Sequence, residues 1–473
     1  MLTSPDHHSV GDSCETDWYC NVEVETVPSV RLENLADRWM LSFGKSEVTF
    51  ALPAGIVTDV FARLSEGGCP LRYLVQAIQH DTSNFLSTQV HRLWSEGLIR
   101  QVLAGDSGVV ASFTSVGATS FVPILPDLYQ EYCWASTAYI RALPSWVTLE
   151  SGESGASIVL NPRCEVLVNY VIQCANPYIP AASLQAATQQ EMLVLTSWLL
   201  DSGFLIRASF VDMDNHASLC FTDKLMHARS RRGRHLGGYG ATHRADGCPP
   251  SSPATPAPTK EQGIILPKPD LQSLCVNDRS LTSVMETRRS IRSHSETPID
   301  RRALGEFLYR VARIREIHNN GDYEVATRPY PSGGALFSIE TYILVNRCID
   351  ISKGLYRYDG VSHQLTKICE FTEDAQRLIA ESSYTSGAVG DPHTLLILSA
   401  RFQRVAWKYE SIAYSLILKE VGVMYQTMYL VATAMDLAPC ALGGGSSTLF
   451  SNLTGIDYWM ESSVGEFLLG NKN

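Results

Sequence analysis

Several patterns that would assign this chain to a common class are missing. Its 473 residues include twelve cysteines but no Cys-x-x-Cys pair, and the cysteines are scattered from Cys14 to Cys440. Metal-binding and disulfide-rich proteins space their cysteines closely, so we expect no metal site, no disulfide framework and reduced thiols in the cytoplasm. The acidic, polar start MLTSPDHHSVGDSCETDWYC does not resemble a secretory signal peptide, and none is expected.

A long hydrophobic run is also missing. The most apolar stretch is VGVMYQTMYLVATAM at 421–435, which lies between charged residues on both sides. A membrane-spanning helix needs about 20 apolar residues, so the stretch predicts a buried core helix and no membrane association. The remaining composition, 45% hydrophobic and 18% charged residues, is typical of a globular protein of several domains.

A weak internal repeat organises the first half of the chain. Trp39 and Trp146 are 107 residues apart, and the Leu-Ile-Arg triplets at 98–100 and 205–207 have the same separation. Each copy begins with a strand-like stretch, continues with helical segments and closes on an amphipathic helix followed by Gly and Leu-Ile-Arg. Helices followed by a strand predict two winged-helix-like modules.

Cations are scarce in both modules. Formal net charge is −11 and the pI is about 5.6. No Lys or Arg lies between Arg163 and Arg207, and only Arg92 lies between Asp81 and Ile99. Phosphate contacts from cations dominate DNA affinity. We therefore expect no nucleic-acid partner, and we interpret the modules as peptide-binding or purely architectural, with an exposed strand edge as one way to hold a peptide.

Two unusual segments separate the halves. The stretch CPPSSPATPAPTKEQG at 248–263 predicts a linker. The preceding stretch HARSRRGRHLGGYGATHRADG at 227–247 is basic and rich in glycine. It is interpreted either as a solvated loop or as a segment that meets an anion or covers an active site, and the sequence alone favours the solvated loop.

The second half contains a pattern that suits a phosphate group. In RRSIR, the residues Arg288, Ser290 and Arg292 alternate, so an extended backbone places them on one face. Two guanidinium groups and a hydroxyl match a phosphate monoester, although a single such cluster also occurs on ordinary surfaces. Either Asp300 or Thr297–Pro298 is predicted to cap the helix that follows.

Further motifs follow in order along the chain. RPYPSGGAL places Gly333 and Gly334 in a turn where the backbone can approach a flat ring. LYRYDGVSHQLTKI predicts a β-hairpin that turns at Asp359-Gly360. TLLILSARFQRVAWKY predicts a buried strand that leads to a Lys-Tyr pair and a long helix, and PCALGGG places three glycines after that helix.

Together these motifs resemble the flavin-dependent nitroreductase fold. More narrowly, residues 225–473 are similar to the SagB-type dehydrogenases, which oxidise azolines in ribosomally made peptides, and the two modules ahead of them are most similar to those of cyanobactin thiazoline oxidases. The predicted fold class is α+β, with a C-terminal nitroreductase-like FMN domain behind two winged-helix-like modules. The predicted division is a polar tail at 1–30, the modules at 31–125 and 126–224, a basic loop and linker at 225–262 and the FMN domain at 263–473.

The resemblance implies FMN bound at a homodimer interface. It assigns three groups of residues: those that hold the phosphate, those that contact the flavin from the second subunit, and those whose backbone N–H groups face the ring. Arg288, Ser290 and Arg292 would hold the phosphate. Ser332, Gly333 and Gly334 would contact the flavin from the second subunit. Gly443 and Gly444 would present their N–H groups to the ring. One departure from the family stands out, because no Lys or Arg lies between Lys419 and Lys472 to supply a further cation.

The resemblance also makes Lys408 and Tyr409 the catalytic pair. Oxidising a thiazoline to a thiazole removes a hydride, which flavin takes, and a proton, which needs a base. If Lys408 lay in the first turn of the long helix, the helix dipole and burial would favour its neutral amine. A neutral Lys408 could then accept the proton, or a lysinium could stabilise a tyrosinate at Tyr409. The alternative is that Lys408 is solvated and Tyr409 packs at helical spacing against Ala413 and Leu416.

The predicted function is therefore FMN-dependent oxidation of thiazolines, or of oxazolines, in a heterocyclised precursor peptide, with oxygen reoxidising the flavin. Three alternatives stay open. The first is a nitro- or quinone reductase that uses NAD(P)H. The second is a winged-helix regulator that senses redox state through flavin, and the third is an inactive scaffold in a biosynthetic complex.

Overall fold

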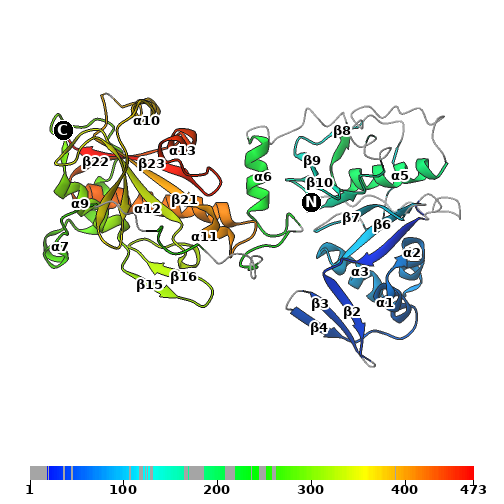
Figure 1. Cartoon of the computed structure of the whole chain (residues 1–473). Coiled ribbons are helices and arrows are strands. Elements are labelled where there is room, and N and C mark those ends of the chain that lie inside the picture. Colours follow the sequence, from blue (N-terminus) through cyan, green and yellow to red (C-terminus); the bar gives the residue numbers. More distant parts are fainter. Residues whose placement is uncertain are drawn as a thin grey trace. The chain divides into compact units, whose positions relative to one another are not determined.

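The computed structural model of the chain divides into two compact units, Met1–Gly237 and Gly238–Asn473 (Figure 1). The described residues are 19, 21–35, 38–43, 46–105, 108–116, 121–122, 124, 126–127, 132–164, 169, 186–207, 219–235, 237–243, 252–257, 263–388 and 390–473.

The first unit is built on a seven-stranded sheet of order β5-β1-β6-β7-β11-β10-β9. Its strands are β1 (Val22–Thr26), β5 (Cys69–Pro70), β6 (Ile99–Gly105), β7 (Gly108–Thr114), β9 (Ala138–Ala142), β10 (Val147–Ser151) and β11 (Ser157–Leu160). Two smaller sheets contain β2 (Val30–Asn34), β3 (Trp39–Phe43) and β4 (Ser46–Phe50), and β8 (Tyr132–Trp134) with β12 (Leu205–Arg207). The helices are α1 (Ile56–Glu66), α2 (Leu71–His80), α3 (Phe85–Ser95), α5 (Ala186–Asp201) and α6 (Phe221–Arg229).

The two predicted copies share their closing elements. Helix α3 leads through a glycine into β6, and α5 leads in the same way into β12. They differ in pairing, because β6 lies between β1 and β7 whereas β12 pairs with β8. Most of 165–185, the middle of the second copy, lies outside the described residues, so the winged-helix assignment stays a prediction.

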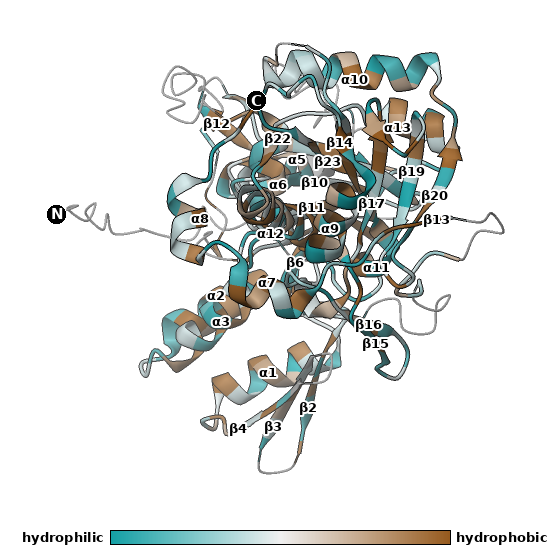
Figure 2. Cartoon of the chain, turned by 90° about the vertical axis from the view of Figure 1, so that its left-hand side faces the viewer, coloured by the Kyte–Doolittle hydropathy of each residue, from teal (hydrophilic) through white to brown (hydrophobic). Residues whose placement is uncertain are grey.

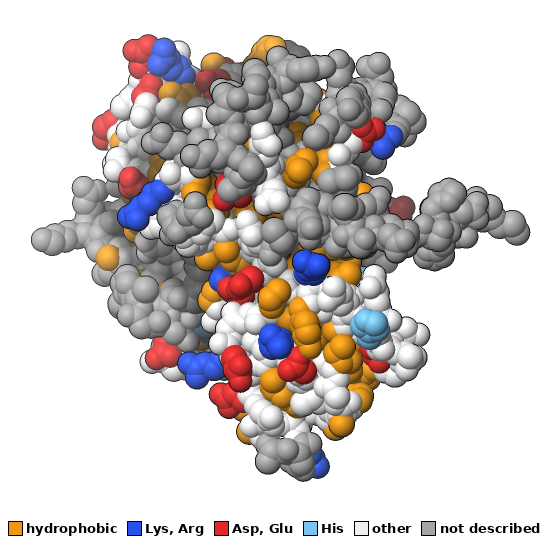
Figure 3. All heavy atoms as spheres, turned by 90° about the vertical axis from the view of Figure 1, so that its right-hand side faces the viewer, with side chains coloured by type: hydrophobic (Ala, Val, Ile, Leu, Met, Phe, Trp, Pro, Cys, Tyr) orange, Lys and Arg blue, Asp and Glu red, His pale blue; other side chains and the backbone are white. Residues whose placement is uncertain are grey.

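Both copies contribute to one hydrophobic core. Gln101 of β6 is buried at its centre, where its amide donates to the carbonyl of Phe121 at 2.5 Å and accepts from the indole of Trp198 at 2.8 Å. A buried amide is tolerated there because its partners satisfy it. On the face drawn in Figure 3, the acidic and basic side chains of the described residues are intermixed rather than gathered by sign.

The second unit is built on a seven-stranded antiparallel sheet of order β13-β20-β19-β17-β21-β23-β22. Its strands are β13 (Ile264–Ile265), β17 (Ile339–Val345), β19 (Gly354–Asp359), β20 (Gln364–Cys369), β21 (Thr394–Arg401), β22 (Leu437–Leu442) and β23 (Glu461–Asn471). Two short pairs are β14 (Ile299–Asp300) with β18 (Cys348–Ile349), and β15 (Glu316–Asn319) with β16 (Glu324–Thr327). The helices are α7 (Leu271–Asn277), α8 (Leu281–Thr287), the 3-10 turn η4 (Gly333–Ala335), α9 (Arg301–Ala312), α10 (Glu373–Ser386), α11 (Phe402–Ala406), α12 (Ala413–Ala434) and α13 (Ser447–Thr454).

Both faces of this sheet are covered. Alternate residues of β17 and β21 point to opposite faces, so Ile343 and Leu398 join a core with α9 and α12, while Leu344 and Ile397 join a core with α10 and α13. Figure 2 shows the two helix pairs on opposite sides of the strands. The central strands β17 and β21 are therefore buried along their whole length and mostly hydrophobic, and their buried charges Glu340 and Arg401 pair with each other.

Several local predictions are confirmed. Strands β19 and β20 form the expected hairpin, whose turn is closed by Asp359 Oδ1 accepting from the N–H of Val361 at 2.8 Å. Asp300 caps α9 by accepting from the N–H of Ala303 at 2.7 Å. Strand β21 is buried along its whole length.

Part of the predicted linker packs onto the second unit. Ala254 is fully buried, and its N–H donates to the Glu324 carboxylate at 2.7 Å. Arg404 is buried and donates to the carbonyl of Ser252 at 2.6 Å, and Arg401 donates to the hydroxyl of Ser252 at 2.6 Å. The prediction of a simple tether is therefore wrong for 252–257.

Helix α12 is only partly a core helix. One side is buried, but Tyr414, Leu418 and Val423 are exposed at 47%, 41% and 38%. The prediction of a buried helix at 421–435 is therefore confirmed for one side, where Val421, Met424, Met428 and Ala432 are buried, but not for Val423. Within the described residues, no helix has the combined length and hydrophobicity needed to cross a bilayer.

Candidate active site

The predicted catalytic pair meets the predicted flavin-contacting turn at one glycine. Gly334 has a φ of +65°, and a Cβ added there would lie 2.6 Å from the hydroxyl oxygen of Tyr409 and 3.4 Å from Nζ of Lys408. A Cβ on the neighbouring Gly333 would contact the side chain of Leu416 at 3.3 Å. The turn therefore approaches the Tyr409 hydroxyl more closely than a side chain at residue 334 would allow, with Lys408 Nζ at contact distance.

Lys408 and Tyr409 do not lie on the long helix. They follow α11, where their N–H groups donate to the carbonyl of Val405 at 3.2 and 2.9 Å, and α12 begins only at Ala413. Ser411 between the two helices has a φ of +63°, which interrupts the helical path. The argument from the N-terminal dipole of α12 is therefore wrong.

The partner of Lys408 is a tyrosine that the sequence did not single out. Nζ of Lys408 donates to the hydroxyl of Tyr323 at 2.9 Å and lies 4.7 Å from the centroid of that ring. It also lies 5.5 Å from the ring centroid of Tyr409. Lys408 is half-buried rather than fully solvated, and Tyr409, Ala413 and Leu416 all pack against the same hydrophobic core.

The end of the basic, glycine-rich segment is attached to this site. Gly240 forms a two-way backbone bridge with Glu410, and the N–H of His243 donates to the carbonyl of Lys408 at 3.2 Å. The Ser411 hydroxyl donates to the carbonyl of Gly238 at 2.7 Å. The stretch 238–243 is mostly exposed, as expected of a solvated loop, but it is hydrogen-bonded along the backbone of the predicted catalytic pair.

A buried carboxylate lies beneath the turn. Oε2 of Glu420, on α12, accepts from the Ser332 hydroxyl at 3.0 Å and from the hydroxyl and N–H of Ser338 at 3.1 and 3.4 Å. Its Oε1 is buried and has no hydrogen-bond partner among the described residues. Burial raises the pKa of Glu420, against the opposing effect of Arg328 and the two serines.

The predicted phosphate ligands converge on another part of the unit. The Arg288 guanidinium lies 5.2 Å from the ring centroid of Tyr429, and the Ser290 hydroxyl is 2.7 Å from the Tyr429 hydroxyl. Burial raises the pKa of the Cys440 thiol on β22, and the nearby Arg292 and Ser290 both act against that rise. Arg292 and Ser290 therefore lie close to β22. The alternating geometry predicted for RRSIR agrees with this arrangement.

A polar cavity of about 600 Å³ lies next to this cluster. Lys472 borders the same cavity as Arg288, although it also forms a 2.9 Å ion pair with Asp436. Lys472, the first Lys or Arg after Lys419 in the sequence, therefore lies near Arg288. The lining residues are Arg279, Glu286, Thr287, Arg288, Arg289, Ile291, Thr433, Asp436, Leu437 and Lys472.

The three glycines after β22 differ in their surroundings. A Cβ on Gly443 or Gly444 would meet no atom within 4 Å, whereas one on Gly445 would overlap the carboxyl group of Glu466. A cavity of about 310 Å³ borders all three, together with Tyr425. The open backbone at Gly443 and Gly444 fits a flat ring, and the cations near Arg288 fit a phosphate, so the residues present fit FMN.

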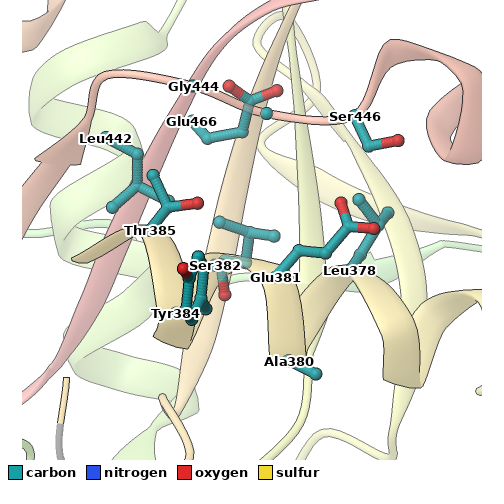
Figure 4. Close-up of a pocket in the computed structure, with 12 residues that line it drawn as sticks. Leu378, Ala380, Glu381, Ser382, Tyr384, Thr385, Leu442, Gly444, Ser446 and Glu466 are labelled. Carbon is teal, nitrogen blue, oxygen red and sulfur yellow. The ribbon is translucent and has the colours of Figure 1, made fainter. Parts of the chain in front are cut away.

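A second cavity of about 370 Å³ borders Gly444 and Gly445 (Figure 4). Glu381, Ser382 and Thr385 of α10 line it, as does Glu466, whose pKa is raised by burial. No group of three or more His, Cys, Asp or Glu side chains within the described ranges is placed to hold a metal ion.

The predicted site residues thus form two clusters. The first, which we call the turn cluster, contains Ser332, Gly333, Gly334, Lys408 and Tyr409. The second, the phosphate cluster, contains Arg288, Ser290 and Arg292 beside β22, and the predicted ring-facing residues Gly443 and Gly444 directly follow that strand.

Comparison with known proteins agrees with the fold expected for the second unit. Residues 285–470 match the model of the Nitroreductase family, so the C-terminal part of the chain carries a nitroreductase-family domain. The protein MJ1384 of Methanocaldococcus jannaschii, whose name describes a nitroreductase, is 24% identical over 37% of this chain and 81% of its own length. The microcin B17-processing protein McbC of Escherichia coli is 31% identical over 28% of this chain and 49% of its own length, so the match spans about half of McbC.

Solved structures give weaker similarity. The Escherichia coli microcin synthetase McbBCD complex with truncated pro-MccB17 bound matches with a TM-score of 0.35 and 20% identity, over 49% of this chain and 82% of that chain. A Ralstonia eutropha protein described as a nitroreductase matches with a TM-score of 0.36 and 20% identity, over 47% of this chain and 94% of that chain.

Proposed function

We propose that this chain is an FMN-dependent dehydrogenase that oxidises azoline rings, thiazolines first among them, in a ribosomally made peptide. The observation that carries the proposal is the meeting of Lys408 and Tyr409 at Gly334 within a nitroreductase-family domain. The relative McbC, named for processing microcin B17, supports a peptide substrate.

The phosphate cluster is the proposed holder of FMN. Arg288, Ser290 and Arg292 would bind its phosphate with Lys472 as a further cation, since a phosphate monoester carries close to two negative charges. The N–H groups of Gly443 and Gly444 would face the ring. FMN, when bound, would supply the two-electron acceptor of the reaction.

The turn cluster is the proposed place of proton transfer. Conversion of a thiazoline to a thiazole removes a hydride and a proton from adjacent ring carbons. Lys408 and Tyr409, whose polar groups meet at this turn, share the task of taking that proton. Acid–base help of this kind contributes about a hundredfold to ten-thousandfold in rate.

A homodimer is part of the proposal. One copy would supply its phosphate cluster and the other its turn cluster to a single site. The exposed side chains of Tyr414, Leu418 and Val423 on α12 give each copy apolar surface that a partner can cover. The N-terminal modules are the proposed peptide-recognition part, and oxygen the proposed final electron acceptor.

Mass spectrometry tests the proposal directly. A peptide that contains a thiazoline, incubated with the FMN-loaded protein and oxygen, should lose two hydrogens per ring. Lys408→Ala should retain FMN and lose at least a hundredfold in rate. A yellow protein that leaves the peptide mass unchanged would contradict the proposal.

A nitro- or quinone reductase is the second candidate. The family match over 285–470 and the similarity to MJ1384 favour it. It predicts rapid NAD(P)H oxidation in the presence of a nitroarene or quinone. Because the azoline enzyme takes its electrons from the peptide, rapid turnover of NAD(P)H without peptide would favour the reductase.

A further inference from the structure

We infer that Tyr323 is a positioning residue for Lys408, and that its hydroxyl oxygen rather than its ring performs this role. The expected effect of Tyr323 on the rate of azoline oxidation rests on the proposed function. The contact that carries it is the 2.9 Å hydrogen bond from Nζ of Lys408 to the Tyr323 hydroxyl, between residues 85 positions apart.

The Tyr323 hydroxyl is itself fixed from the opposite side. Tyr323 lies in the turn between β15 and β16, and the side-chain amide of Asn320 donates to its hydroxyl oxygen at 2.7 Å. The turn is closed by the N–H of Asn320, which donates to the carbonyl of Tyr323 at 2.8 Å. The phenol oxygen therefore accepts two hydrogen bonds, from Asn320 and from Lys408.

The hairpin that carries Tyr323 is anchored to the body of the unit. Arg404 donates to the carbonyl of Glu324 at 2.9 Å, and the Glu324 carboxylate accepts from Ala254. Aromatic rings pack around Tyr323: its centroid lies 5.6 Å from that of Trp407 and 6.4 Å from that of His243. The position of the phenol is therefore set by the fold and not by Lys408.

A lysine side chain has four rotatable bonds and loses much freedom when it is held in one position. Here its amine is held by one oxygen and lies over two phenol rings. The hydrogen bond to Tyr323 keeps Nζ of Lys408 at the turn, 3.4 Å from the position that a Cβ of Gly334 would occupy. The Tyr409 hydroxyl lies 2.6 Å from the same position. Without the Tyr323 oxygen, the amine is free to leave the turn.

Two substitutions separate the oxygen from the ring. Tyr323→Phe removes the acceptor and keeps the ring, and Tyr323→Leu removes both. If the oxygen positions Lys408, Tyr323→Phe lowers kcat for azoline oxidation about tenfold to hundredfold, because small displacements of a catalytic group reduce the rate by that much. KM changes by less than about twofold. Tyr384→Phe is the matched control, because Tyr384 is 90% exposed.

A second readout does not depend on turnover. The amine reagent trinitrobenzenesulfonate is applied to the full-length protein, with and without FMN, and modification of each lysine is followed by peptide mass spectrometry. Tyr323→Phe and Asn320→Ala should raise the modification rate of Lys408 at least about threefold and leave that of Lys353 unchanged, since an amine released from its acceptor is more accessible. Unchanged Lys408 labelling in Tyr323→Phe would overturn the inference.

The two readouts separate this inference from the proposed function. If the wild-type protein fails to oxidise azolines while Lys408 labelling responds to Tyr323→Phe, the proposed function is wrong and the positioning role stands. If azolines are oxidised and Tyr323→Phe changes neither kcat nor labelling, the positioning role is wrong and the proposed function stands.

Discussion

The hydroxyl oxygen of Tyr409 lies 2.6 Å from the position that a Cβ of Gly334 would take. The turn of the predicted flavin-contacting segment and the catalytic pair therefore fit together only because residue 334 has no side chain. The Tyr409 hydroxyl is the far end of a rotatable side chain and can swing away. We expect a methyl group at residue 334 to harm the position of the hydroxyl more than the fold.

The first prediction compares Gly334→Ala with Gly387→Ala. Both glycines have a φ of +65°, but a Cβ on Gly387 would meet nothing within 4 Å. Both variants should lose about 1–2 kcal/mol of stability from left-handed strain. Only Gly334→Ala should also lose kcat for azoline oxidation, about a hundredfold. Equal kcat in the two variants would show that Tyr409 need not lie at the turn.

The second prediction concerns the three glycines after β22. Gly443→Ala and Gly444→Ala should fold with unchanged melting temperature, since their Cβ positions are open. If a flavin ring lies against this backbone, both should weaken FMN binding at least about tenfold, measured by flavin fluorescence. Gly445→Ala should instead lower stability by about 1–3 kcal/mol, because its methyl group overlaps buried Glu466. Normal FMN affinity in all three variants would place the ring elsewhere.

Local chemistry made much of the second unit predictable. The cap at Asp300 and the turn at Asp359 are formed by hydrogen bonds to residues two or three positions away. A short stretch of sequence therefore contains all the residues needed to predict them. The alternation of RRSIR likewise brought Arg288 and Ser290 to one ring, that of Tyr429.

Contacts between distant segments were not predictable. The sequence pattern predicts one helix for WKYESIAYSLILKE. The backbone of Ser411 is instead in the left-handed conformation, and its hydroxyl donates to the carbonyl of Gly238. Lys408 is therefore separated from α12. Nothing near Tyr323 in the sequence marks it as the partner of Lys408. Glu420 looked like an ordinary surface charge between Lys419 and an apolar run, and only the fold shows that its partners are Ser332 and Ser338.

The third prediction tests the phosphate ligands with a pair of flavins. Arg292→Ala and Ser290→Ala should weaken FMN binding about tenfold to hundredfold, the usual size for charge-assisted hydrogen bonds to phosphate. Riboflavin has the same ring but no phosphate, so its affinity should not change. Lys472→Ala should behave in the same way if Lys472 supplies the further cation. Arg377→Ala on exposed α10 is the control.

A parallel loss of riboflavin and FMN affinity would contradict this assignment. It would mean that the substitutions disturb the ring site or the fold. Isothermal titration of each variant with both flavins, alongside its melting temperature, distinguishes these cases.

The fourth prediction concerns the buried carboxylate beneath the turn. Burial raises the pKa of Glu420 above its ordinary value of 4.5. The carboxyl group of Glu420 then keeps its proton to a higher pH in the folded state than in the unfolded state. Its contribution to stability is therefore largest below about pH 4.5 and falls as pH rises through the folded-state pKa. Glu420→Gln cannot titrate, so its stability relative to the wild type should increase from pH 4.5 upward, by at most about 1.4 kcal/mol per pH unit.

Urea unfolding at several pH values measures this difference, with Glu381→Gln on exposed α10 as the control, which should show no such trend. Glu420→Ala should lose about 2–4 kcal/mol at pH 4.5 and less as pH rises, because it cannot titrate and leaves the donors of Ser332 and Ser338 unpaired. A constant difference between wild type and Glu420→Gln from pH 4.5 to 8 would mean that the carboxylate titrates alike in both states. The turn that carries Gly334 would then rest on an ionised group, and the stabilising partner of that charge would have to be Arg328.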